Sequence, residues 1–204
     1  MRRGLSVKSP QSAFRNNRVN LPNDAEAIWQ PIYDYQTKTA AATATQRFFI
    51  DPIGTGGKTQ ADTNMELSGQ IPKGQAFLIT GIQVELYPGE LVGQATIAEF
   101  ADDVYDFYKG GALKLKIGSK DYVTQGNLMK FAPVNRLGVS SASGTTAVNY
   151  LYACATGREF AIKDLLLESS QNFSVELLEL AAMPSGNAAR VGVTLNGFLY
   201  RNSQ

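Results

Sequence analysis

Alternation of apolar and polar residues is the main pattern along the chain. Apolar residues recur at even positions in residues 78–86, which places Leu78 on one predicted face with Ile82 and Val84, and similar alternation returns in residues 113–117 and 190–200. Successive side chains of a strand point to opposite faces of a sheet, so this period predicts strands with one buried face. The predicted core residues are Leu78, Ile82, Val84, Val175, Leu177, Val191, Val193 and Leu195.

Other segments rich in β-branched and aromatic residues are also short, and glycine, proline and polar residues separate them. Residues 113–117 and 121–124, joined by Gly118 and Ser119, predict a hairpin with lysines on its outer face. About eight segments of this kind indicate an all-β antiparallel sandwich of two sheets. They span residues 43–50, 67–86, 113–117, 121–124, 148–153, 160–167, 173–180 and 190–200.

A helical period occurs once, over residues 94–108. Its apolar positions follow the spacing of one helix face, and acids fill the other face. We expect one short amphipathic helix in a connection, with its aromatic residues in core contacts and its acidic face in solvent. The apolar positions are Ile97, Phe100, Val104, Phe107 and Tyr108.

Residues 1–40 differ in composition from the rest, and they predict an extended N-terminal arm before a sandwich domain of residues 41–204. Prolines interrupt regular structure, no acid precedes Asp24, and the early charged residues are all basic. The chain has a formal net charge of +1, so the remainder is net acidic. The basic residues are Arg2, Arg3, Lys8, Arg15 and Arg18.

Two roles for this arm, apart from a solvated tail without contacts, follow from its residue types. Its basic residues suit salt-sensitive contact with a nucleic acid or an anionic lipid surface. Its apolar and aromatic residues suit contact with a neighbouring subunit, which charge alone would not require. The candidate subunit contacts are Phe14, Leu21, Ile28, Trp29, Ile32 and Tyr33.

The residue counts argue against an enzyme. The chain has no histidine, which is the usual general base and the commonest metal ligand, and its one cysteine excludes an internal disulfide framework. We therefore expect no catalytic residues, no cofactor and no metal site. The N-terminus lacks an apolar signal region, and the apolar runs are too short to span a bilayer, so we expect synthesis in a cytoplasm.

One segment resembles a phosphate-binding loop. Residues 54–59 read Gly-Thr-Gly-Gly-Lys-Thr, but Pro52 stands where such a loop has its first glycine. The residues after Thr59 also lack the apolar period of the helix that must follow. The pattern therefore does not predict nucleotide binding.

Three segments resemble jelly-roll capsid proteins of tailless icosahedral bacteriophages. They are residues 69–82, 171–177 and 191–201, and they include Gly69-Gln70-Ile71-Pro72-Lys73-Gly74 and Val191-Gly192-Val193-Thr194-Leu195. The resemblance implies a jelly-roll subunit without catalytic site that assembles with copies of itself and with other virion proteins. Its location would be the capsid of a virion made in a host cytoplasm, with or without an internal membrane.

The length of the chain departs from many such proteins, which contain two jelly rolls. After the arm, this chain has room for one, so a single-roll shell subunit and a pentamer at the vertices both remain open. The alternative from another class is a receptor-binding or carbohydrate-binding sandwich, such as a spike or lectin-like module, and an enzyme of unrecognised type is third. Particle formation separates the first from the others.

Overall fold

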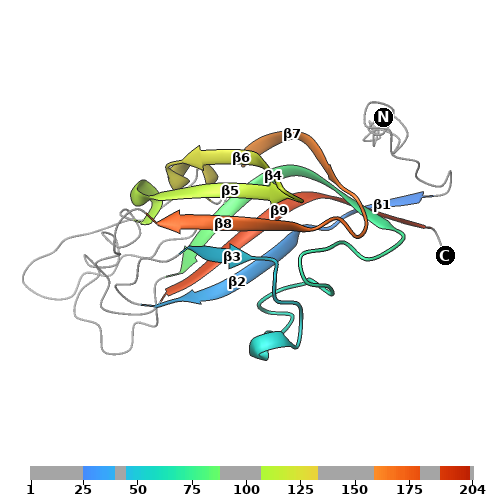
Figure 1. Cartoon of the computed structure of the whole chain (residues 1–204), viewed down its shortest axis with the longest axis horizontal. Helices are drawn as coiled ribbons and strands as arrows, with labels where there is room; N and C mark the ends of the chain where they lie inside the picture. The colour runs from blue at the N-terminus through green and yellow to red at the C-terminus, as the bar shows by residue number, and fades with distance from the viewer. Residues whose placement is uncertain (1–24, 40–44, 88–106, 133–158, 180–188, 203–204) are drawn as a thin grey trace, which may run out of the picture.

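The computed structural model describes residues 25–39, 45–87, 107–132, 159–179 and 189–202. These form two facing antiparallel sheets (Figure 1). The strands are β1 Ala25–Trp29, β2 Ile32–Lys38, β3 Gln46–Phe48, β4 Gln75–Tyr87, β5 Gly111–Ile117, β6 Lys120–Gly126, β7 Phe160–Leu167, β8 Phe173–Glu179 and β9 Ala189–Asn202, with short 3-10 helices η1 Thr55–Gly57 and η2 Leu128–Phe131. No described helix is long and apolar enough to cross a membrane.

The strand order is that of a jelly roll. One sheet runs β1-β9-β4-β7, with β2 also on β9, and the other runs β3-β8-β5-β6. β1 and β2 pair with consecutive stretches of β9, so together they occupy one edge position. The chain then passes between the sheets from β2 to β3, β4 and β5, and again from β6 to β7, β8 and β9, which gives the eight-position arrangement of a jelly roll. The predicted all-β sandwich is confirmed.

The interior between the sheets is filled by the apolar faces of the strands. The predicted core residues of β8 and β9 are all buried there, and so are Ile82 and Val84 of β4. The hairpin of β5 and β6 is confirmed, with Lys114 and Lys116 alternating with buried residues of β5. This packing supplies the main apolar burial of the domain.

Leu78 is buried as predicted, but it lies on the opposite face from Ile82. The pairing of β4 with β9 shifts between Ile79 and Gly81, which leaves Thr80 as an extra residue, and the pairing of β4 with β7 is also irregular at this point. A bulge of one residue reverses which positions face inward, so Phe77 and Ile79 join the core below it while Leu78 points outward. Gly197 lies opposite Ile79, where a Cβ would stand 2.0 Å from the Leu78 carbonyl oxygen.

The sandwich begins earlier in the chain than the predicted boundary at residue 41. Residues 25–29 and 32–38, assigned above to the arm, pair with β9 as β1 and β2 and are part of the sandwich. Pro31 falls between the two strands, at a sheet edge where the missing N–H is tolerated. Residues 1–24 lie outside the described residues.

Other predicted elements have different limits from those expected. β3 is shorter than the predicted segment 43–50, whereas in the segment 67–86 the alternating residues form β4, which begins at Gln75 after the turn of residues 69–74. Of the predicted helix 94–108, only Phe107 and Tyr108 are described, in a helical turn of residues 107–110. Both are buried, with the Tyr108 hydroxyl donating to the Val84 carbonyl at 2.9 Å. Residues 94–106 and the predicted strand 148–153 lie outside the described part.

The packing generates a prediction about two leucines. Leu177 of β8 is completely buried, so Leu177→Ala should lower the free energy of unfolding by about 2–5 kcal/mol. Leu67 is 43% exposed, so Leu67→Ala should change it by less than about 0.5 kcal/mol. Urea unfolding followed by circular dichroism measures both, and equal losses would contradict the assigned core.

Candidate functional site

The connection between β3 and β4, residues 49–74, folds back on itself beneath the sandwich (Figure 1). Its two limbs are joined by backbone hydrogen bonds, from Gly69 N–H to Phe49 O at 2.7 Å and from Ile53 N–H to Met65 O at 3.0 Å. We call residues 49–74 the β3–β4 loop. Because the limbs bond to each other and to β2, the loop has a defined shape that can support a surface site.

The β3–β4 loop covers the edge of β2 that β9 leaves open. The Tyr35 N–H donates to Asp62 O at 2.7 Å, and the Tyr33 N–H donates to the Asn64 side-chain oxygen at 3.0 Å. The Asn64 amide group also donates to Pro31 O at 2.9 Å. An uncovered edge strand is a template for unwanted pairing, so these contacts block β2 as a site of strand addition.

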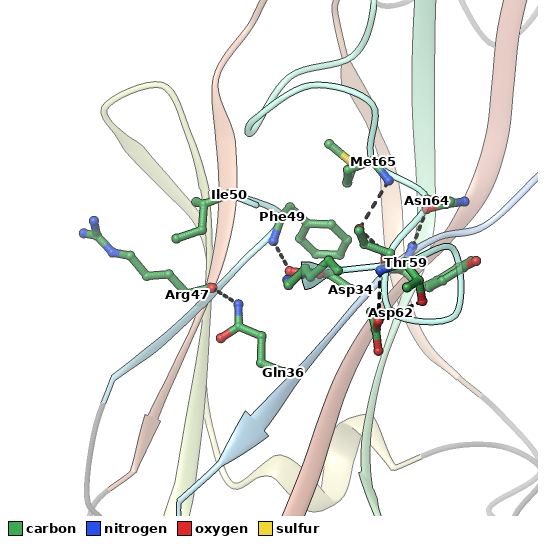
Figure 2. A network of polar contacts seen from close by, with 12 residues as sticks. Asp34, Gln36, Arg47, Phe49, Ile50, Thr59, Asp62, Asn64 and Met65 are labelled. Carbon is green, nitrogen blue, oxygen red and sulfur yellow. Dashed lines mark hydrogen bonds and ion pairs between the residues drawn. The ribbon is translucent and has the colours of Figure 1, made fainter. Parts of the chain in front are cut away.

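A buried carboxylate fastens the loop to the sheet. Asp34 of β2 has no exposed surface, and one of its oxygens accepts a hydrogen bond from the Phe49 N–H at 2.7 Å (Figure 2). Its other oxygen accepts one from the Lys58 ammonium group at 2.5 Å. Burial raises the pKa of Asp34, and the bonds from Lys58 and Phe49 offset this only in part. The loop therefore depends on an ion pair whose carboxylate is completely buried.

The strongest candidate for a ligand site is a cavity of about 700 Å³ between β2, the β3–β4 loop and the start of β9. Its wall carries both signs of charge together with amide, hydroxyl and aromatic groups. Such a lining suits a polar, uncharged ligand that both donates and accepts hydrogen bonds. The cavity is lined by Tyr35, Gln36, Thr37, Asp51, Gly56, Gly57, Lys58, Asp62, Ala189 and Arg190.

Two cations line this cavity, and each already has an anionic partner. Lys58 is bound to Asp34. The Arg190 guanidinium lies 2.9 Å from an Asp62 oxygen and stacks over the Tyr35 ring, 4.4 Å from its centre. Both cations are therefore neutralised by carboxylates and are not available to bind a phosphate. The residues directly after Thr59 form turns, whereas a phosphate-binding loop is followed by a helix. The geometry agrees with the sequence argument against a phosphate loop.

An aromatic and charged cluster lies on the outer face of the sheet that contains β2, β4 and β9. The hydroxyls of Tyr35 and Tyr87 both donate to one Glu85 oxygen, at 2.8 and 2.7 Å. Burial and the Glu85 carboxylate raise the pKa of Tyr35, so its hydroxyl stays a hydrogen-bond donor to Glu85. Gly192 lies beneath the ring, where a Cβ would approach it to 2.1 Å, so the flat packing of Tyr35 requires glycine there.

Charge pairs also order the other sheet and join the two sheets. Glu176 of β8 is buried and lies 2.9 Å from both Arg47 and Lys116, whose charges lower the pKa of Glu176, with the hydrogen bond from Lys116 as the largest cause. Lys38 of β2 pairs with Glu179 of β8, which links the sheets at one side of the sandwich. Within the described ranges, no three His, Cys, Asp or Glu side chains are grouped to hold a metal ion.

The predicted subunit contacts fall into different environments. Trp29 is 56% exposed, whereas Ile28 is half-buried. Ile32 differs from the expected surface position, because it faces inward beside Leu195, is 6% exposed and packs in the core of its own domain. The Tyr33 hydroxyl is bound to Gln60 O at 2.5 Å. The other two predicted subunit contacts lie outside the described residues, and so do all the predicted basic contacts to a nucleic acid or lipid. These residues are Phe14, Leu21, Arg2, Arg3, Lys8, Arg15 and Arg18.

The sequence reasoning missed Asp34 and the pair it makes with Lys58. A signal was present, because the alternation around Ile32 places Asp34 on the same inward face, and a buried carboxylate needs a partner. Which cation supplies that partner depends on the path of the loop. No periodic pattern in residues 49–65 gives that path.

Comparison with protein-family models gives no match for this chain, and a search of curated proteins gives none.

The Asp34–Lys58 pair generates a pH-dependent prediction. Lys58→Met leaves the Asp34 charge buried without its partner, which should cost about 3–5 kcal/mol of unfolding free energy at pH 7. The folded-state pKa of Asp34 lies above the ordinary 3.8 and should rise further in this variant. The folded variant then binds a proton at Asp34 more tightly than the unfolded chain does. The loss of unfolding free energy relative to wild type should therefore shrink as the pH falls toward the raised pKa of Asp34 in the variant.

Denaturant unfolding at several pH values measures this deficit. Lys73→Met is the matched control, because Lys73 is exposed in the same loop and should change the free energy by less than about 0.5 kcal/mol at any pH. A pH-independent deficit for Lys58→Met, or one no larger than that of the control, would show that the pair does not fasten the loop.

Proposed function

We propose that this protein is a structural subunit of a virion, which assembles with copies of itself into an icosahedral shell around a genome. The observation that carries the proposal is the single-domain jelly roll, with its two sheets in the order β2-β9-β4-β7 and β3-β8-β5-β6. Viral capsid domains, lectins and cupins share this architecture, so the fold narrows the choice to a few classes. The resemblance of residues 69–82, 171–177 and 191–201 to phage capsid proteins favours the first class.

The composition weighs against the cupin class and against catalysis in general. Cupin enzymes hold their metal with histidines on the strands, and this chain has none. A shell protein requires no reactive site, but it does require extended surfaces with fixed shape. The bonded limbs of the β3–β4 loop and its covering of the β2 edge supply one such surface.

The basic residues before β1 have a role in this proposal. Arg2, Arg3, Lys8, Arg15 and Arg18 precede a net acidic remainder of the chain. They would face the particle interior and neutralise phosphates of the genome or the headgroups of an internal membrane. The sandwich would make the contacts with copies of the chain and with other virion proteins.

A second candidate function is carbohydrate or receptor binding by a spike or lectin-like module. The polar cavity of about 700 Å³ favours it, because hydrogen-bonding groups of both kinds surround one aromatic residue there. A glycan panel tests it directly. Binding that is lost in Asp51→Ala, by a protein that forms only small oligomers, would favour this candidate over the shell.

The shell proposal predicts a specific effect of the early basic residues. Replacing all five with serine should leave a folded sandwich but reduce the nucleic acid or lipid content of particles, because the neutralising charges are gone. Negative-stain microscopy gives particle yield, and absorbance and phosphate assays give content.

A control variant carries serine at Lys73, Lys120 and Lys130, which are exposed on the sandwich. It removes cations without touching residues 1–24, and its particles should keep their content. Equal content in the two variants would refute the interior role, and failure of the wild-type chain to form particles would refute the shell itself.

A further inference from the structure

The outer face of the sheet β3-β8-β5-β6 carries a group of long cationic side chains. Glu176 of β8 pairs with Arg47 of β3 on one side and with Lys114 of β5 on the other. Lys116 lies two residues after Lys114 and therefore on the same face. Neighbouring strands lie about 4.8 Å apart, and alternate residues of one strand about 7 Å apart, so the three cations share a small area. We call Arg47, Lys114 and Lys116 the basic face.

The acid within the basic face lies beneath its cations. The Glu176 side chain is only 6% exposed, although it lies on the outer side of the sheet, because Arg47 and Lys116 bind its two oxygens. The Nε and one Nη group of Arg47 reach it at 2.9 Å, and the Arg47 side chain stays 60% exposed. A guanidinium has five N–H donors, so Arg47 keeps donors for a second anion. Solvent therefore meets the cations, while the neutralising charge is buried under them.

Lys114 has the weakest anionic contact of the three cations. Its ammonium nitrogen is 4.0 Å from an Asp121 oxygen, which is beyond hydrogen-bond distance, whereas Lys116 lies 2.9 Å from Glu176. The outer face of this sheet, as far as its strands are described, thus sets three cations against two acids, and one of the acids is buried. Positive charge and unused donors remain for a ligand.

The opposite side of the sandwich carries carboxylates that cations do not offset. On the outer face of the other sheet, Glu85 accepts hydrogen bonds from two tyrosine hydroxyls, and Glu159 accepts one from the Asn196 amide group. These donors are neutral, and no described cation lies within ion-pair distance of either acid. The two outer faces therefore differ in charge, and a polyanion would be attracted to the basic face and repelled by the carboxylates opposite.

The surroundings of the basic face favour a nucleic acid over a lipid surface. Tyr122 follows Asp121 on edge strand β6 and is 49% exposed, and it is the one exposed large apolar side chain in the described strands of this sheet. Bases of a single strand stack on such rings while cations hold the phosphates. A protein that lies on a membrane instead buries several apolar side chains among the lipids, and these strands do not offer them.

We propose that the basic face binds the phosphate backbone of a single-stranded nucleic acid, with Tyr122 stacked on one of its bases. The inference rests on the proposed function and goes further, because it gives the folded domain its own contact with the genome, apart from the basic residues before β1. It also orients the subunit. The sheet β3-β8-β5-β6 would face the particle interior, and Glu85 and Glu159 would face away from the genome.

Fluorescence anisotropy with a labelled oligothymidylate tests the site without requiring particles. The full-length chain with serine at the five early basic residues lacks the other predicted contact, and it should still bind. In this background, Lys114→Glu should weaken binding roughly fivefold at about 0.1 M salt, because each phosphate neutralised on a single strand adds about 0.7 to the slope of log affinity against log salt. Tyr122→Ser should weaken binding roughly tenfold through the lost stacking.

Two matched variants separate binding from folding. Glu176→Gln removes the buried acid and keeps the three cations, so it should strengthen binding, which a damaged fold would not do. Lys73→Glu makes the same change of charge as Lys114→Glu, but at an exposed position in the β3–β4 loop, and it should leave the affinity unchanged. Circular dichroism checks that each variant keeps its strands.

Equal affinities for Lys114→Glu and Lys73→Glu, or no binding once the early basic residues are replaced, would overturn the basic face as a nucleic-acid site. Vesicles of phosphatidylserine and phosphatidylcholine test the lipid alternative. If they bind with this pattern of variants and the oligothymidylate does not, the proposal is wrong. Closed shells without such binding would refute this inference alone, whereas binding by a chain that forms no shells would keep the site and refute the shell.

Discussion

The pairing of β9 with strands from both halves of the chain is the constraint on which the sandwich depends. β9 lies between β4 on one side and β1 and β2 on the other, so the end of the described chain holds its beginning in the sheet. These contacts join residues far apart in sequence, and such topologies close slowly because loop entropy is lost before packing compensates. The long apolar face of β9, with Val191, Val193 and Leu195 fully buried, supplies that compensation.

Two local departures from regular structure give this sandwich its particular surfaces. The extra residue Thr80 reverses the facing of β4 and produces an apolar row outside the core. The inward carboxylate of Asp34 draws in Lys58 and with it the β3–β4 loop, which covers the β2 edge and encloses the polar cavity. Thr80 lies in β4 and Asp34 in β2, and both strands pair with β9. A surface built in this way has a fixed shape, as repeated contacts between identical subunits require.

The sequence predicts the sandwich well where one period holds along a strand. Val175 and Leu177, with the alternating residues of β9, are buried as expected because nothing interrupts their period. A single extra residue was enough to reverse Leu78, and the sequence signal for it is Gly81, because an isolated glycine inside a strand pattern often accompanies a bulge. Residues 25–38 lie in the sandwich although their prolines favour an arm, because Pro31 only separates two strands that share one edge of the sheet. Contacts of the β3–β4 loop depend on its path in space, which period and composition do not encode.

Self-assembly is the central claim, and a lectin-like module is its main competitor because it shares the fold. The most direct measurement is the mass distribution of the purified full-length chain by sedimentation velocity, from dilute to concentrated solution, with microscopy of the heaviest fraction. The account predicts closed shells, or pentamers and hexamers that form them. A chain that remains a monomer or a small oligomer throughout this range would contradict it.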